Sequence, residues 1–190
     1  MLLIQQIHLT EREKMADEKL ERLKFKRLNR ILAMLLHDIK DLPDEGMDFP
    51  IRWHIMHMFS SSQLPKLLAI HRGIEPESAG IAAALHDIGA VMTGKHEGHA
   101  VAGEKYVIEF LTRYNNESKL KTITEEEIDR IINAIVKHSE KDKDSNDLFV
   151  ELLKDVDSLD RYFHGVKTEG AHSERCNRVM KELMLNKNIV

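Results

Sequence analysis

The sequence predicts an all-α protein, and three observations support this prediction. Apolar residues recur at helical spacing over most of the chain, no segment shows strand alternation with turn spacing, and helix-starting and helix-ending residues separate the periodic segments. The chain has 190 residues, which is enough for one hydrophobic core without disulfides or oligomerisation. We therefore expect a single compact domain, built as a bundle of about six or seven helices.

The first predicted helix covers about residues 11–40. A capping-box pattern from Thr10 to Glu13 begins it, and leucines and isoleucines then recur at helical spacing up to Pro43. Its other faces carry many charged side chains, which indicate either a solvated surface or a helix that binds a partner. We assign residues 1–45 to this charged segment, which packs on or extends from a domain of residues 46–190.

The next two predicted helices are bounded by proline and glycine. One covers about residues 50–71, with Pro65 as a kink or break, and Gly73 ends it. Another begins near Pro76 and runs through small apolar residues to the string His86-Asp87-Ile88-Gly89. A loop over 89–98 follows, and the remaining predicted helices cover about 99–114, 124–138, 147–163 and Gly170 to about Asn186.

Composition excludes several classes of protein. The net charge of −4 gives no basic excess, so we expect no nucleic-acid duplex as partner, whereas a small anionic substrate stays open. The single cysteine, Cys176, indicates a reducing compartment, and we expect a cytoplasmic protein. The apolar start Met1–Ile4 is too short for a signal peptide, and no stretch is long enough to span a membrane.

Histidine is unusually frequent, with 11 residues, and four candidate groups could share a metal ion. Neutral imidazoles and carboxylates bind divalent metals, and His57, the pair His86-Asp87, and Asp157 lie on three separate predicted helices. Adjacent residues on a helix point about 100° apart, so a His-Asp pair serves one site best at a helix end. Gly89 is typical of such an end.

These residues carry a family resemblance. The run Ala83–Gly89, preceded by His57 and followed by Asp157 within Asp155–Arg161, closely resembles the HD-domain phosphohydrolases over roughly Trp53–Phe163. In that family a histidine, the His-Asp doublet and a later aspartate bind a divalent metal. The resemblance implies an HD-domain helical bundle and the same role for these four positions.

Two ambiguities concern the first ligand. His54 and His57 lie on one helix face, but His57 precedes His86 by 29 residues, which is the spacing of the family, so we choose His57 and keep His54 as the alternative. A second doublet, His37-Asp38, follows His8 by 29 residues as well. An unbroken helix would hold that pair roughly 40 Å apart, so we expect His37-Asp38 to be an ordinary last helical turn.

A second metal ion is expected at His99 and His138. His99 followed by Gly103 resembles a family motif, and His138 lies where members carry a helix-end histidine. The resemblance then implies one or two divalent ions of Mn, Fe, Co, Ni or Zn, with Asp87 ligating or bridging them and orienting water. His96 is the alternative to His99, and a solvent-exposed or supporting role is the alternative for both histidines.

Two cations are candidate phosphate-binding groups. Lys95 follows the doublet in the predicted loop, and Arg161 lies one turn past Asp157. An ordinary surface charge is the alternative interpretation of each. Many family members have Lys or Arg directly after His-Asp-Ile-Gly, whereas this chain has Ala90.

The expected function is that of a metal-dependent phosphohydrolase acting on a phosphoester or phosphoanhydride of a nucleotide or related small phosphate compound. The ligand layout looks similar to that of small bacterial members that cut diadenosine tetraphosphate, and nucleoside monophosphates and guanosine tetraphosphate are also family substrates. The alternatives are a di-iron oxygenase and a non-catalytic HD-fold module, and a homo-oligomer stays open. The remaining histidines are expected to be solvated: His8, His71, His164 and His172.

Overall fold

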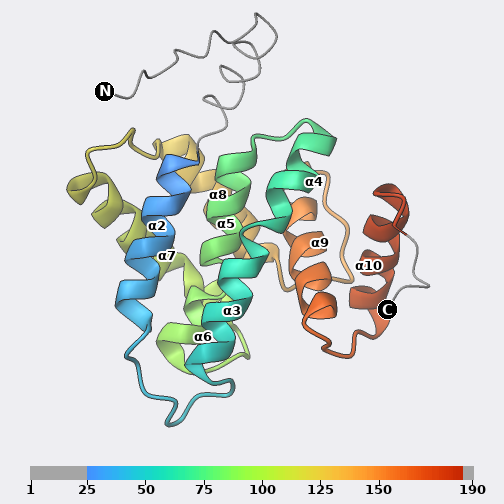
Figure 1. The fold of residues 1–190 in the computed structure, drawn as a ribbon, viewed down its shortest axis with the longest axis horizontal. Coiled ribbons are helices and arrows are strands. Elements are labelled where there is room, and N and C mark those ends of the chain that lie inside the picture. The colour runs from blue at the N-terminus through green and yellow to red at the C-terminus, as the bar shows by residue number, and fades with distance from the viewer. Residues whose placement is uncertain (1–24, 186–190) are drawn as a thin grey trace, which may run out of the picture.

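The computed structural model describes residues 25–185, and within this range all regular structure is helical, which confirms the predicted fold class. Nine helices occupy the described part of the chain (Figure 1). They are α2 (Lys26–Ile39), α3 (Ile51–Ser61), α4 (Leu64–Arg72), α5 (Pro76–Leu85), α6 (Ile88–Thr93), α7 (His99–Glu117), α8 (Glu125–Lys137), α9 (Leu148–Phe163) and α10 (Gly170–Glu182). No helix among the described residues is both long and apolar enough to span a membrane.

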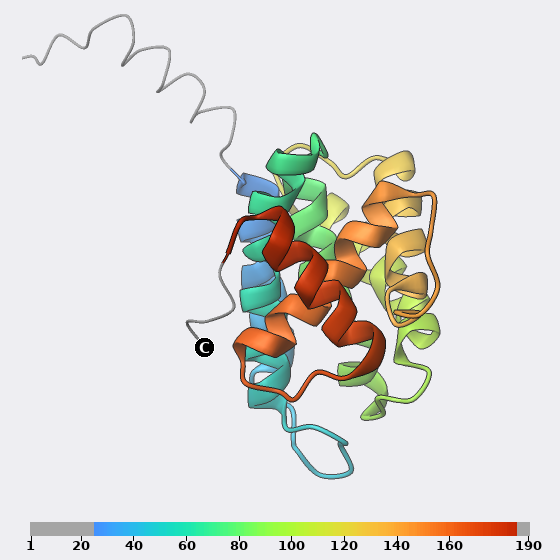
Figure 2. The same ribbon diagram turned by 90° about the vertical axis from the view of Figure 1, so that its right-hand side faces the viewer.

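Helix α5 is the centre of the packing. It contacts α2, α3, α4, α8 and α9, and every residue from Ser78 to Leu85 is buried. Its many alanines, with Gly80, allow neighbouring helices to approach closely, because small side chains leave room for a second backbone. Apolar residues of all nine described helices join one core cluster. Helix α10 lies against α9 on the side seen in Figure 2.

Two of the predicted helices are each divided in the structure. The segment predicted over 50–71 forms α3 and α4, with the break at Ser62-Gln63 just before Pro65, and Gly73 ends α4 with a positive φ of 70°. The break expected at Pro65 is therefore confirmed. The segment after Pro76 divides into α5 and α6 at His86-Asp87.

Gly89 lies inside α6, so the prediction that it ends a helix is wrong. A Cβ at Gly89 would lie 2.1 Å from the carbonyl oxygen of His99 and 2.7 Å from the nitrogen of Gly103. The glycine is required because α6 crosses the start of α7 almost backbone to backbone. The helix ends instead at Gly94, whose φ is 72°, and the loop to α7 is shorter than predicted.

The first and last predicted helices differ from the structure at their ends. Phe25 has a non-helical ψ of 57°, so an unbroken helix over 11–40 is wrong at this residue. The rest of that prediction, with the Thr10 capping box, lies outside the described residues. Helix α10 ends at Glu182, and the expected end at Asn186 also lies outside them. The boundary between residues 45 and 46 stays a prediction, although α2 buries Leu28 and Ile31 in the common core.

Candidate metal centre

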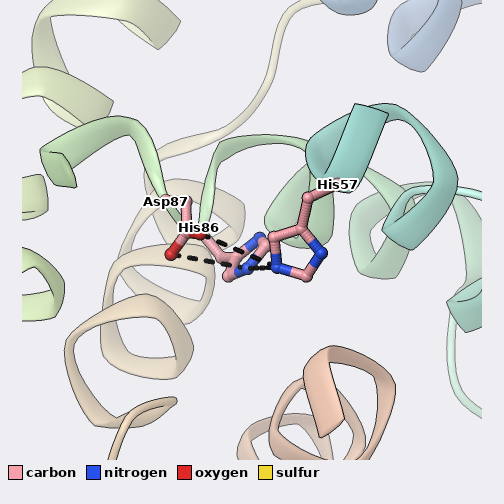
Figure 3. A group of neighbouring side chains, drawn as sticks. All are labelled: His57, His86 and Asp87. Carbon is pink, nitrogen blue, oxygen red and sulfur yellow. Dashed lines mark hydrogen bonds and ion pairs between the residues drawn. The ribbon is translucent and has the colours of Figure 1, made fainter. Parts of the chain in front are cut away.

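The structure brings the six predicted metal ligands together in one buried cluster. They come from α3, from the junction of α5 and α6, from the first residue of α7, from the residue after α8, and from α9. Each is at most 6% exposed: His57, His86, Asp87, His99, His138 and Asp157. Figure 3 shows the side chains of His57, His86 and Asp87 directed toward one another.

One half of the cluster is built around His57. Its Nε2 atom lies 3.1 Å from Oδ1 of Asp157 and 3.1 Å from Nε2 of His86. The same atom lies 3.7 Å from Oδ2 of Asp87. His57, His86 and Asp87 therefore offer three donor atoms within 4.8 Å of one another, which is a spacing that could hold a metal ion.

The other half is built around the second oxygen of Asp87. Its Oδ1 lies 3.0 Å from Nε2 of His99 and 3.7 Å from Nε2 of His138, and these two nitrogens are 3.0 Å apart. These three residues form a further group that could hold a metal ion. Asp87 belongs to both groups, and its Oδ1 also lies 3.5 Å from Nε2 of His86. A third group, His86, His138 and Asp157, connects the two halves.

The hydrogen bonds of the histidines fix which nitrogen is free. In His86, His99 and His138, Nδ1 donates to the carbonyl oxygen three residues earlier, at 2.7, 2.5 and 2.6 Å respectively. A carbonyl oxygen can only accept, so in the neutral ring the hydrogen is on Nδ1 and Nε2 carries a lone pair. The Nε2 lone pairs of His99 and His138 face each other at 3.0 Å beside the carboxylate of Asp87, and this arrangement fits a bound cation.

His57 is held by a residue that the sequence analysis missed. Its Nδ1 donates to Oδ2 of Asp160 at 2.6 Å, and Trp53 stacks on the ring with centroids 5.6 Å apart. Burial would lower the pKa of His57, but the hydrogen bonds to Asp157 and Asp160 outweigh it and raise the pKa to about 10. Asp160 lies three residues after Asp157, on the same face of α9, and this spacing was the available signal.

The two carboxylates in the cluster are ionised. Burial would raise the pKa of Asp87, but the surrounding histidines, His86 first among them, hold it well below its usual value. Burial would likewise raise the pKa of Asp157, and the ammonium group of Lys141 with the neighbouring histidines holds it well below. Two buried carboxylates among imidazole nitrogens are a donor set typical of a divalent metal site.

Lys141 is a second residue that the sequence analysis missed. It is 7% exposed, and its Nζ lies 2.6 Å from Oδ2 of Asp157 and donates to the carbonyl oxygen of His138 at 2.6 Å. Arg175 of α10 holds the loop, because its Nε donates to the carbonyl oxygen of Lys141 at 2.9 Å. A lysine in the polar run after His138 resembles any solvated loop residue, so no sequence signal distinguished it.

A cavity of about 100 Å³ lies over the cluster. Lys141 and the predicted Arg161 both line it, with the half-buried His96 and His172. The predicted Lys95 does not reach this cavity: it is exposed and its Nζ lies 3.0 Å from Oδ1 of Asp48. The loop that carries Lys95 is tied to the Asp48 segment, so the structure does not bring this candidate to the ligands.

The alternative histidines lie beside the cluster. His54 is 2% exposed and its Nδ1 has no hydrogen-bond partner, yet it belongs to none of the ligand groups among the described residues. His96 stacks on His99 with ring centroids 4.5 Å apart, and the backbone carbonyl oxygen of His96 accepts the Nδ1 hydrogen of His99. The geometry thus favours His57 and His99 as the ligands.

The second His-Asp doublet lies apart from the cluster. His37 is exposed in the last turn of α2, as predicted, and Asp38 forms an ion pair with Arg113. His8 lies outside the described residues. Of the histidines expected to be solvated, His71 and His164 are exposed, whereas the expectation is wrong for His172 because α10 folds over the cavity.

Comparison with known proteins agrees with this geometry. A family model described as the HD domain matches residues 54–162, which is more than half of the chain. The structure is similar to the crystal structure of a predicted HD superfamily hydrolase from an uncultured Thermotogales bacterium. The two are 23% identical with a TM-score of 0.55, over 87% of this chain and 95% of the other, which supports the fold. No curated protein matches the sequence.

Proposed function

The chain belongs to the HD-domain family, and from this premise we propose that it is a metal-dependent phosphohydrolase. It cleaves a phosphoester or phosphoanhydride bond of a nucleotide or related small phosphate compound. One observation carries the proposal: six buried candidate ligands, Asp87 among them, lie beside a small polar cavity, and the cations Lys141 and Arg161 line the same cavity. The solved structure with a similar fold is that of a predicted hydrolase, which supports the proposed reaction class.

The ligand groups divide between two positions. His57, His86, Asp157 and Asp87 would hold one divalent ion, and Asp87 with His99 and His138 would hold a second. Manganese, iron, cobalt, nickel and zinc all accept such ligands. When bound, divalent ions would supply Lewis acidity, which lowers the pKa of water toward neutrality and neutralises charge on phosphoryl oxygens.

The other residues of the cavity contribute charge and position. Arg161 is a permanent cation and offers paired N–H donors, which match the oxygens of a phosphoryl group. Lys141 compensates Asp157 at 2.6 Å and adds a second positive charge on the substrate side. In hydrolysis a water oxygen forms the new bond to phosphorus, the bond to the leaving oxygen breaks, and that oxygen gains a proton. Positive groups fixed beforehand stabilise the charge that develops on the phosphoryl oxygens.

The test uses the full chain, stripped with a chelator and reloaded separately with manganese, iron(II), cobalt, nickel or zinc. Release of phosphate or mononucleotide is measured over phosphate monoesters, nucleotides and dinucleoside polyphosphates. We expect metal-dependent hydrolysis of at least one class, lost in His86→Ala and retained in His37→Ala, which changes the other His-Asp doublet. A metal-loaded protein that releases nothing from any of these compounds contradicts the proposal, and iron-dependent oxygen consumption would identify an oxygenase instead.

A further inference from the structure

Helix α10 adds a histidine to the cavity from outside the matched domain. The match to the HD domain ends at residue 162, whereas His172 lies in the first turn of α10, which packs across α9 (Figure 2). His172 is half-buried and lines the cavity together with Asp87 and Asp157. It belongs to none of the ligand groups among the described residues, so the metal centre does not explain its position.

The hydrogen bonds of Ser158 determine the tautomer of His172. The hydroxyl group of Ser158 donates its single hydrogen to the carbonyl oxygen of Lys154 at 2.9 Å. Its oxygen, 3.1 Å from Nδ1 of His172, must therefore accept the Nδ1 hydrogen. In the neutral ring the free edge then carries Nε2 with a lone pair, so His172 presents a hydrogen-bond acceptor to the cavity.

The surroundings keep this ring neutral. Burial lowers the pKa of His172 to about 4, and the nearby cations, Lys141 first among them, act in the same direction. A phosphate oxygen is itself an acceptor and forms no hydrogen bond with a second acceptor. The group that pairs with Nε2 of His172 must therefore be a donor.

The lining of the cavity places this donor next to the phosphoryl group. His172 lines the same small cavity of about 100 Å³ as Lys141 and Arg161, so a group at its Nε2 lies close to a phosphoryl group bound by these cations. Every described residue that lines the cavity is polar or charged. The carbon skeleton of a substrate therefore lies at the mouth, where the half-buried His172 and Arg161 are found.

We propose that His172 is a specificity-determining residue that accepts a hydrogen bond from a hydroxyl group next to the phosphoryl group of the substrate. The substrate class is then a hydroxyl-bearing phosphate monoester, such as a sugar phosphate or a nucleoside monophosphate. This inference rests on the proposed hydrolysis and adds the contact that selects the leaving group. An unpaired buried acceptor disfavours analogues that lack the hydroxyl.

The test compares two compounds that differ in their hydroxyl groups. Hydrolysis of glycerol 1-phosphate and of propyl phosphate is measured as kcat/KM in the wild type, His172→Phe and His172→Gln. We expect the wild type to prefer glycerol 1-phosphate about five- to tenfold, the contribution of one hydrogen bond. The ratio should fall to about one in His172→Phe and stay intermediate in His172→Gln, whose amide oxygen can still accept. Both ratios come from the same protein sample, so a misfolded fraction cancels.

The outcomes separate this inference from the proposed function. A wild-type ratio near one, or an equal fall for both compounds in His172→Phe, overturns the role of His172. If the wild type hydrolyses neither compound with any divalent metal, calorimetric binding of both compounds to the metal-loaded proteins replaces kcat/KM, and the wider substrate screen alone decides the proposed function. Tighter binding of glycerol 1-phosphate that is lost in His172→Phe would then support the contact, whereas equal binding would refute it.

Discussion

Replacing Asp160 should weaken metal binding without removing a ligand atom. Its carboxylate accepts the Nδ1 hydrogen of His57 at 2.6 Å, and neither side chain is more than 2% exposed. Asp160→Asn keeps an acceptor of the same size but removes the charge, so we expect the Kd for metal to rise about tenfold, or ~1.4 kcal/mol. Asp160→Ala leaves Nδ1 of His57 unpaired and its ring free to turn, so we expect the Kd for metal to rise about 100-fold.

The assay is a competition titration of the stripped protein with zinc or manganese against a chromogenic chelator. Asp38→Asn is the control, because Asp38 also lies beside a histidine in the sequence but pairs with Arg113 at the surface. Asp160→Ala should also cost about 1–3 kcal/mol of unfolding free energy through its unpaired donor. Both Asp160 variants binding metal within twofold of the wild type would refute the idea that this carboxylate orients His57.

Three further predictions concern protons, packing and buried charge. Because the pKa of metal-free His57 is about 10, against an ordinary 6.5, metal binding at pH 8 should release about one proton from it, measured by calorimetry in buffers of different ionisation enthalpy. The raised pKa stabilises the metal-free fold fully below pH 6.5, so its stability should fall as pH rises through 10. Gly89→Ala should lower the unfolding free energy by about 3 kcal/mol, because its Cβ would clash with the backbone of α7. Gly98→Ala has open space around its Cβ and should lower it by about 1 kcal/mol, with both values measured in urea titrations. Arg175→Met should cost about 3 kcal/mol because it removes the buried cation beside Asp155 and Glu151, although Arg72 and Lys154 still pair with these carboxylates. Arg178→Met, which changes the half-exposed partner of the same carboxylates, should cost at most about 1 kcal/mol, and equal losses would contradict the role of burial.

Features with a local cause were predictable from the sequence. The capping box of Thr124 and Glu127 begins α8, Asp147 caps α9, and Gly73 ends α4, each through hydrogen bonds or backbone angles within a few residues. The ligand set was also accessible, because the His-Asp doublet resembles a family motif of fixed spacing. The prediction of Gly89 was wrong because its role depends on α7, which lies close in space and not in sequence.

Residues that act through tertiary contacts could not be predicted. Lys141 occurs in a polar run that resembles a solvated loop. In the fold, Arg175 donates a hydrogen bond to the backbone carbonyl oxygen of Lys141, and the side chain of Lys141 pairs with Asp157. His172 matches no sequence motif, and the packing of α10 on α9 brings it to the cavity. Lys95 shows the opposite case. Its position in the sequence favoured a phosphate-binding role, but in the structure it forms an ion pair with Asp48 instead.

The central claim is that the described His-Asp cluster holds divalent metal through Asp87. The most direct measurement is the metal content per chain, by elemental analysis after loading and desalting, of the wild type, Asp87→Ala and His37→Ala, with circular dichroism to check folding. We predict one or two equivalents in the wild type and in His37→Ala, and none in folded Asp87→Ala. Metal retained by Asp87→Ala, or lost equally from both variants, would contradict the account.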